Sequence, residues 1–284
     1  TVPSHDTFQR VFSILKPNLI QESFVKWAQS LNKVKEGEVI SLDGKKMRGS
    51  RDDWHGRVSI DMVSAWASEA GIVLAQQTVA EGSNEIATVP EVLKAIILKG
   101  CVVVADAANC QAENTRIVIE GGGDYAFNLK KNHPKFCDEI DQMCDYESKT
   151  EFNKVKSKTI TTLEKGHGRV ETRHYRLVTD DEYINYFNNK GKWWKLAGIG
   201  IVDRTRIKKG KTESERHYFV TSLNDVKTFA DAVRRYWSIE NNLHWTLDVT
   251  FQEDAHRART EFQPHNCAML RHIALNLLKL ETSV

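Results

Sequence analysis

The chain has 284 residues, of which 40% are hydrophobic and 27% are charged, and its mean hydropathy is −0.47. This composition excludes a disordered chain, and no apolar run approaches the roughly 20 residues that a membrane-spanning helix needs. A chain of this length can bury a substantial core, in one large domain or two modest ones. The net charge of +2 says little about partners, whereas the distribution of charge is informative.

The first residues of the chain and its cysteines indicate the cellular compartment that we expect for the protein. The chain opens Thr-Val-Pro-Ser, without an initiator Met and without a charged-then-apolar leader. This predicts a cytoplasmic protein, trimmed or expressed as a fragment. The five cysteines form no CxxC pair and their number is odd, so we expect reduced thiols rather than disulfides or a zinc site.

Residues 1–36 are predicted to form a helical N-terminal segment. Ser4 can cap a first helix, Pro17 interrupts it, and a second amphipathic helix follows as far as Leu31. Two such helices could be a helix-turn-helix DNA reader. The segment has no basic recognition face, so we favour a helical hairpin docked on the main domain.

Residues 37–150 are predicted to be the first part of an α/β core. Three strands come first and helices then alternate with strands, which indicates a mixed sheet flanked by helices. This is the ribonuclease-H-like order, in which carboxylates gather at strand ends. We predict strands at 39–43, 59–67, 71–79, 101–105 and 125–129, helices at 84–97, 112–119 and 135–143, and a basic loop at 44–50.

Residues 151–220 are predicted to be a β-rich insertion, because the alternation of helices and strands stops there. Between residues 154 and 217, sixteen Lys and Arg residues stand against eight Asp and Glu residues, and aromatic residues are interleaved with them. A basic surface with rings that can stack suits a phosphate backbone and unpaired bases. We therefore expect nucleic-acid contact; the alternative is a solvated surface whose charges only confer solubility.

Residues 221–284 are predicted to complete the core. A helix begins near Thr228, and steps of three and four place Val233, Trp237, Glu240, His244 and Leu247 on one face. That face carries a carboxylate where the pattern requires an apolar residue. A buried carboxylate is usually ion-paired, protonated or bound to a cation.

The last predicted helix, residues 267–280, is amphipathic and closes the chain. Its expected core face consists of Leu270, Ile273, Leu277 and Leu280. We expect it to pack against the sheet without a chemical role.

Three acidic residues could together form one divalent-metal site. Asp43 and Asp106 each end an apolar strand, and Glu240 interrupts the apolar helix face. Each also has a structural interpretation: Asp43 could begin a turn, Asp106 could cap a helix, and Glu240 could pair with Arg235 or His244.

Other polar residues lie near these acids in the sequence. Asp248, Glu253 and Asp254 are reserve candidates for the helical ligand. His244 and His256 lack zinc-ligand spacing. Asn84 and Glu85 are interpreted as the start of a helix rather than as metal ligands.

Several motifs in the same order resemble the H-repeat-associated proteins, a branch of the DDE insertion-sequence transposases, and the resemblance runs almost end to end. The motifs are Ser41-Leu42-Asp43-Gly44-Lys45-Lys46-Met47-Arg48-Gly49-Ser50, Ser83-Asn84-Glu85-Ile86, Val104-Ala105-Asp106-Ala107 and Trp237-Ser238-Ile239-Glu240-Asn241-Asn242-Leu243-His244-Trp245.

The resemblance implies a ribonuclease-H-like catalytic core in which Asp43, Asp106 and Glu240 are the catalytic, metal-binding triad. Two Mg²⁺ ions, for which Mn²⁺ could substitute, would serve in-line attack of water or a DNA 3′-hydroxyl on phosphorus. The implied partners are double-stranded DNA, as element ends and target, and a second copy of the chain on that DNA. The implied location is the bacterial cytoplasm, in association with the nucleoid.

Two features depart from the family pattern. Family members usually have a longer N-terminus, and its loss could remove DNA recognition. Related transposases often place a Lys or Arg two turns after the helical Glu, where this chain has Leu247 and Asp248. The predicted DNA contacts are Lys45, Lys46, Arg48, Lys130, Arg173, Arg204, Arg206, Lys208, Lys209 and Arg235.

Three functions follow. The first is a DNA transposase that cuts and joins element ends. The second is a nuclease of the same fold that only hydrolyses nucleic acid, and the third is a decayed or domesticated transposase that only binds DNA.

Overall fold

The computed structural model describes residues 2–31, 34–80, 82–130, 132–149, 152, 154–166, 168–188 and 191–281. Lys190, one of the basic residues of the predicted insertion, lies outside them. The chain divides into two compact units, Thr1–Cys101 with Tyr236–Val284 and Val102–Arg235. The four sequence segments predicted above follow different boundaries, and that division stays a prediction.

The sheet of unit 1 is an antiparallel meander of three strands. Strand β1 (Val39–Met47) pairs with β2 (Ile60–Ala67), and β2 pairs with β3 (Ile72–Thr78). Most of their residues are buried, because helices cover the meander; α3 (Glu85–Ala95), for example, contacts β2 and β3. The three strands predicted for this part of the chain are confirmed, although β1 is longer than expected.

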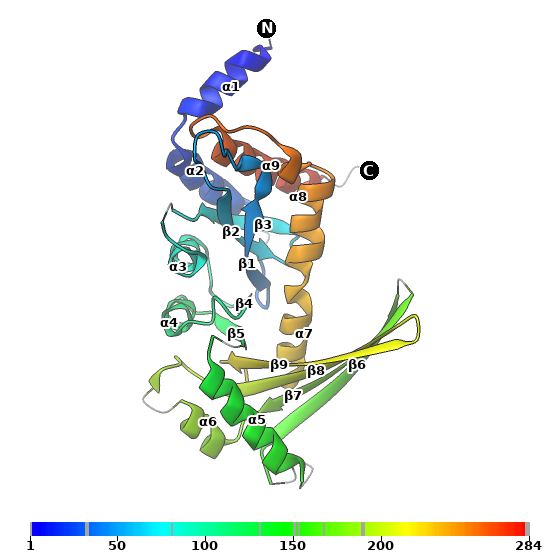
Figure 1. Ribbon diagram of the computed structural model, residues 1–284. Coiled ribbons are helices and arrows are strands. Elements are labelled where there is room, and N and C mark those ends of the chain that lie inside the picture. Colours follow the sequence, from blue (N-terminus) through cyan, green and yellow to red (C-terminus); the bar gives the residue numbers. More distant parts are fainter. Residues whose placement is uncertain are drawn as a thin grey trace. The chain divides into compact units, whose positions relative to one another are not determined.

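The remaining long helices of unit 1 are α1 (His5–Ile14), α2 (Pro17–Ser30) and α9 (Gln263–Leu280). Ser4 caps α1 as predicted, its hydroxyl accepting a hydrogen bond from the backbone N–H of Thr7 at 3.3 Å. Helices α2 and α9 both contact β3, the strand at one end of the meander (Figure 1).

The predicted core face of α9 is wrong. Leu270 and Leu277 are exposed, whereas polar residues such as Asn276 are fully buried. The Asn276 amide hydrogen-bonds both the N–H and the C=O of Val73 in β3, at 2.8 Å each. A side-chain amide can satisfy the open edge of a strand, so hydrogen bonding rather than hydropathy sets the orientation of this helix.

Unit 2 begins with a parallel β-α-β element. Strand β4 (Val102–Ala105), helix α4 (Ala112–Glu120) and strand β5 (Asp124–Leu129) follow in order, and β4 and β5 pair in parallel. All four residues of β4 are buried, as its apolar sequence predicts. Three strands in a meander followed by this element give the predicted ribonuclease-H-like order along the chain.

The β-rich insertion consists of four long antiparallel strands. They are β6 (Ser157–Gly166), β7 (Arg169–Val178), β8 (Gly198–Lys208) and β9 (Lys211–Thr221), and the order within unit 2 is β4-β5-β9-β8-β7-β6. Lys209 and Gly210 join β8 to β9 with positive φ angles of 49° and 75°. Two residues with positive φ make the hairpin turn whose twist matches that of paired strands.

Helices cover both faces of this sheet (Figure 1). Phe219 of β9 packs on Phe229 of α7 (Val226–Tyr236), with ring centroids 5.6 Å apart. The preceding residue, Tyr218, points to the opposite face of the sheet, and its hydroxyl donates a hydrogen bond to Asp141 of α5 (Pro134–Ser148). The mixed α/β class with a β-rich insertion, flanked by helices, is therefore confirmed.

The helix predicted from Thr228 to Leu247 is present as three pieces. After α7 come a π-helical turn, η3 (Ile239–His244), and a short helix, α8 (Trp245–Val249). A π-turn holds more residues than an α-turn, so it changes which side chains share a face. No described helix is both long and apolar enough to cross a membrane.

Candidate functional site

Asp43 lies in the middle of a strand and not at its end. Strand β1 continues to Met47, which pairs with Ile60 of β2, so the loop predicted at residues 44–50 is strand up to Met47. The sequence pattern predicts a loop here because Gly44 and the two lysines after it are unusual in a strand. The register places Asp43 opposite Ser64.

Asp43, Glu240 and His244 form a cluster in unit 1. One potential ligand atom from each residue lies within 4.8 Å of the other two. His244 Nδ1 is 3.1 Å from Glu240 Oε2 and 3.5 Å from Asp43 Oδ2. The fold thus brings two of the three predicted acids together although they are far apart in sequence.

The environment of Glu240 corrects one prediction. Its side chain is 61% exposed, so it is not the buried carboxylate expected on an apolar face. Trp237, expected on the same face, is 43% exposed, whereas His244 and Leu247 are buried. The π-helical turn explains the difference, because it shifts the register between these residues.

His244 is the residue of this cluster that the sequence does not predict as part of the site. Burial lowers its pKa, and the neighbouring Glu240 carboxylate only partly opposes that effect. Its side chain is 7% exposed, and Nε2 has no hydrogen-bond partner among the described residues. The available signal was its position four residues after Glu240, which places the two side chains on one side of a helical turn.

Asp106 belongs to unit 2, where it directly follows β4 as predicted. Its Oδ1 accepts hydrogen bonds from the backbone N–H of Asn109 at 3.1 Å and from Asn109 Nδ2 at 3.0 Å. These bonds hold the turn ahead of α4, whose N-cap is Gln111, so Asp106 does not cap the helix itself. Its participation in a metal site stays a prediction.

The cluster offers a donor set that fits a divalent cation. Asp43 and Glu240 supply carboxylate oxygens, the ligands that Mg²⁺ and Mn²⁺ prefer. Both side chains are partly exposed, at 24% and 61%, so a phosphate could approach from solvent. His244 can orient Glu240 through Nδ1, as partners of ligating groups commonly do.

Lys45 lies beside this cluster inside an ionic network. Its Nζ is 2.7 Å from Asp248, 3.0 Å from Glu253 and 3.6 Å from Asp254. Burial opposes protonation of Lys45, but Glu253 and Asp248 outweigh it and raise its pKa. The three reserve acids therefore hold Lys45, and the Lys45 side chain, at 10% exposure, offers little surface to DNA.

The other predicted DNA contacts fall into two groups. One group is exposed, with side-chain exposures of 60% for Lys46 and 82% for Arg48. In the other group, Arg173 is 8% exposed, and its guanidinium pairs with carboxylates of its own unit. Lys130, Lys208 and Lys209 belong with the exposed group, whereas Arg204 and Arg206 are ion-paired and largely covered.

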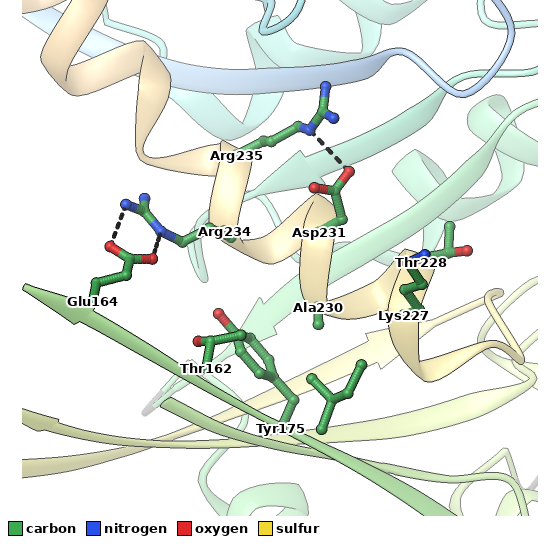
Figure 2. A pocket seen from close by; sticks show the side chains of 10 residues that line it. Thr162, Glu164, Tyr175, Lys227, Thr228, Ala230, Asp231, Arg234 and Arg235 are labelled. Carbon is green, nitrogen blue, oxygen red and sulfur yellow. Dashed lines mark hydrogen bonds and ion pairs between the residues drawn. The ribbon is translucent and has the colours of Figure 1, made fainter. Parts of the chain in front are cut away.

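Arg235, the remaining predicted contact, lines a pocket of about 680 Å³ in unit 2. Its lining residues come from β6, β7 and α7, and the Arg235 side chain points to Asp231 (Figure 2). Arg235 pairs with Asp231 at 2.8 Å. Arg234 pairs with Glu164 at 2.6 and 2.7 Å, and these bonds lower the pKa of Glu164. Cations and carboxylates alternate here, so the pocket lacks the uniform positive charge that a phosphate backbone favours.

Comparisons with known proteins give one consistent family. A profile described as the transposase DDE domain matches residues 35–277. "H repeat-associated putative transposase YhhI" of Escherichia coli strain K12 is 32% identical over 281 residues, covering 98% of this chain and 73% of that protein. "Putative transposase YncI" of Escherichia coli O157:H7 is 32% identical over 280 residues, covering 98% and 71%.

Among solved structures, the chain is similar to a piggyBac transposase in a synaptic complex with hairpin DNA. The sequence identity is 7% and the TM-score is 0.38. The match covers 86% of this chain and 54% of that chain.

Proposed function

Because the chain belongs to the transposase DDE-domain family, as the resemblance to H-repeat-associated proteins predicts, we propose that it cuts and joins DNA ends at a metal-dependent site. The proposed ligands are Asp43, Glu240 and Asp106. The proposed substrate is double-stranded DNA, as element ends and as target, and the active species on that DNA is a homodimer.

One observation carries the proposal: the carboxylates of Asp43 and Glu240 converge on one cluster. Like charges held close together are costly unless a cation or a proton lies between them. His244 fills that role only when it is protonated, and burial lowers its pKa. A divalent ion neutralises the pair more completely and accepts substrate oxygens in its open positions.

Asp43, His244 and Lys45 then have defined tasks. Bound divalent ions would activate the attacking water or 3′-hydroxyl and stabilise the leaving oxygen. Asp43 presents its carboxylate from a strand paired on β2, which fixes its position. His244 holds Glu240 through the 3.1 Å contact, and the Lys45 network ties β1 to α8 and the residues after it.

The experiment is a DNA cleavage and joining assay on the sequences that flank the chain's own coding region. Intact duplexes test cleavage, and pre-cut duplexes with 3′-hydroxyl ends test strand transfer. Asp43→Asn, Asp106→Asn and Glu240→Gln should each lower turnover by at least a hundredfold and leave DNA binding intact. Glu22→Gln, at an exposed position of α2, is the matched control and should behave as wild type.

The outcomes separate the competing functions. Transfer products that require Mg²⁺ or Mn²⁺ support the transposase. Hydrolysis without transfer supports the nuclease, and binding without cleavage supports the DNA-binding remnant. Full activity of Asp43→Asn or Glu240→Gln would exclude the cluster as the catalytic site.

A further inference from the structure

A small hairpin, residues 52–57, stands in the connection between β1 and β2. Asp52 and Arg57 form an isolated antiparallel bridge, in which each backbone N–H bonds the C=O of the other residue, at 3.0 and 2.8 Å. Gly56, with a φ of 66°, lies in the turn, and the His55 ring contacts the Asp52 carboxylate at 2.7 Å. The hairpin is therefore held by its own bonds.

Trp54 lies at the tip of this hairpin and is 90% exposed. Tryptophan has a large apolar surface and is highly buried on average, so an indole in solvent is unusual. Val58, directly after the hairpin, is 70% exposed. The bonds of the hairpin fix its backbone and leave the indole in solvent, which places the ring for contact with another molecule.

The charge around the hairpin indicates what that molecule is. From residue 46 to 59 the cations are Lys46, Arg48, Arg51 and Arg57, and the acids are Asp52 and Asp53. Asp52 is buried, and Asp53 pairs with Arg51 at 2.6 Å. The side chains of Lys46 and Arg48 are 60% and 82% exposed, and their ion pairs are 3.6 and 3.8 Å long. Exposed ion pairs contribute little, so these cations remain able to contact a polyanion.

A pocket of about 270 Å³ in unit 1 adjoins the hairpin. Its lining includes Arg57, at the end of the hairpin, Arg259, and Phe262, which is 39% exposed. Glu261 also lines it and pairs with Arg57 at 3.7 Å. Guanidinium groups beside aromatic rings are the combination to which single-stranded nucleic acid binds, through its phosphates and the faces of its bases.

The hairpin lies within reach of DNA at the candidate metal cluster. Trp54 follows Asp43 by eleven residues, which span at most about 40 Å even when fully extended. One turn of duplex DNA is about 34–36 Å long. A duplex that is cut at Asp43 therefore has bases near the hairpin within little more than one turn of the cut.

We propose that this hairpin is a DNA contact, in which Trp54 stacks on an unpaired or terminal base and the cations around it bind the adjoining phosphates. This inference rests on the proposed function, because cutting a duplex exposes such a base. A base inside an intact duplex is already stacked on its neighbours, so the indole gains a contact only where a base is unpaired or ends the duplex. The hairpin thus distinguishes DNA ends from continuous duplex.

Equilibrium binding in EDTA tests this contact without a DNA reaction. Fluorescence anisotropy compares a duplex that has a short single-stranded tail with a closed circle of the same duplex. Trp54→Ala should weaken binding of the tailed duplex by about five- to a hundredfold and leave binding of the circle unchanged. Trp54→Phe keeps a ring and should retain most of the affinity. Tyr146→Ala, at a 67% exposed position of α5, is the control and should bind as wild type.

Two further readouts distinguish stacking from a general loss of affinity. A 2-aminopurine base in the tail should be quenched by the wild type and by Trp54→Phe but not by Trp54→Ala. Trp54→Ala should keep the salt dependence of binding, whereas Arg51→Gln should make it shallower by about 0.9. Thermal unfolding establishes that each variant is folded. If Trp54→Ala binds and quenches the tailed duplex as wild type, the inference is wrong.

The outcomes also separate this inference from the proposed function. If the wild type binds neither DNA, both proposals fail. If Trp54→Ala loses the tailed duplex but the wild type neither cuts nor joins DNA, the hairpin contact stands and the proposed function fails. If Trp54→Ala changes the oligomeric state in sedimentation without DNA and keeps its DNA affinity, the indole contacts a second copy and only this inference is excluded.

Discussion

At the scale of single residues, Lys45 is a charged side chain that is both largely buried and paired with carboxylates. Its ammonium lies between Asp248 and Glu253, and the Glu253 side chain is only 3% exposed. Removal of Lys45 leaves the buried Glu253 carboxylate with Arg271 alone among the described residues, at 3.9 Å, and the loss of the close partner costs more than the intact pair contributes. Lys45 therefore acts on the cluster by holding strand and helix together, and its contact with DNA stays a prediction.

Lys45→Met should lower the free energy of unfolding by about 3 kcal/mol, because Glu253 loses its nearest cation. Lys46→Met, one residue along the strand, removes the same charge from a side chain that is 60% exposed. That control should change stability by less than about 0.5 kcal/mol. Urea denaturation of both variants measures the difference, and equal effects would contradict the network described for Lys45.

The sequence revealed part of the candidate site and missed another part for a physical reason. Asp43 and Asp106 were visible because each interrupts an apolar run, and Glu240 because it breaks a helical period. The approach of His244 to Asp43, at 3.5 Å, is the part that the sequence does not predict, because it depends on how η3 packs against β1. Nothing in the spacing of residues 43 and 244 encodes that contact.

At the scale of secondary-structure elements, α7 is fixed at its start and along its buried face. Asp225 accepts hydrogen bonds from the N–H and the hydroxyl of Thr228, at 2.8 Å each. Phe229 lies against Gly200 in β8, where an added Cβ would be 2.6 Å from the ring atom Cε2. The helix can lie this close to the sheet only because position 200 lacks a side chain.

Gly200→Ala should therefore destabilise the chain by about 1–3 kcal/mol, because the added Cβ would overlap the fully buried Phe229 ring. Gly166→Ala, at the end of β6, is the control, since a Cβ there meets no described atom within 4 Å. Thermal unfolding distinguishes the two. A Gly200→Ala variant as stable as Gly166→Ala would contradict this packing.

The cap of α7 gives a pH-dependent prediction. The Thr228 N–H lowers the pKa of Asp225, so the carboxylate stabilises the fold above its unfolded-state pKa of about 3.9. That contribution is lost as the pH falls through the lower folded-state pKa. Asp225→Ala should cost about 1 kcal/mol at pH 7 and progressively less in acid. Asp225→Asn keeps an acceptor at every pH, so its stability relative to Asp225→Ala should not fall in the same window.

Most elements could be predicted from periodicity and turn residues, because those signals are local. The strands of the meander and of the insertion follow from alternating or continuous apolar runs. The face of α9 could not be predicted, since Asn276 is buried through bonds to Val73, about two hundred residues away. A local pattern records the polarity of a side chain but not the partner that satisfies it.

At the scale of the whole molecule, the net charge of +2 conceals a strongly basic insertion. Many of its cations are paired internally, such as Arg204 with Glu215 at 2.8 Å. Lys208 and Lys209, at the turn between β8 and β9, are exposed. We expect this turn, more than the paired residues, to contribute to contact with a phosphate backbone.

Changing Lys208 and Lys209 together to Gln should weaken DNA binding. It should also make the negative slope of log affinity against log salt shallower by up to about 2, or roughly 0.9 for each lost phosphate contact. Arg116→Gln combined with Lys135→Gln removes the same formal charge from helices α4 and α5 and should leave the slope unchanged. Fluorescence anisotropy across a salt series measures both. Equal slopes for the two double variants would exclude the turn as a contact.

Unit 1 is built from two segments that are far apart in the chain, and this affects how it folds during translation. Its meander is complete once residue 78 has been made, yet Val73 receives its Asn276 partner only when α9 leaves the ribosome. Unit 2, contiguous in the chain, can become compact first, while the earlier part waits with one strand edge unsatisfied. During translation, the edge of β3 at Val73 would therefore be open to chaperones that recognise extended segments.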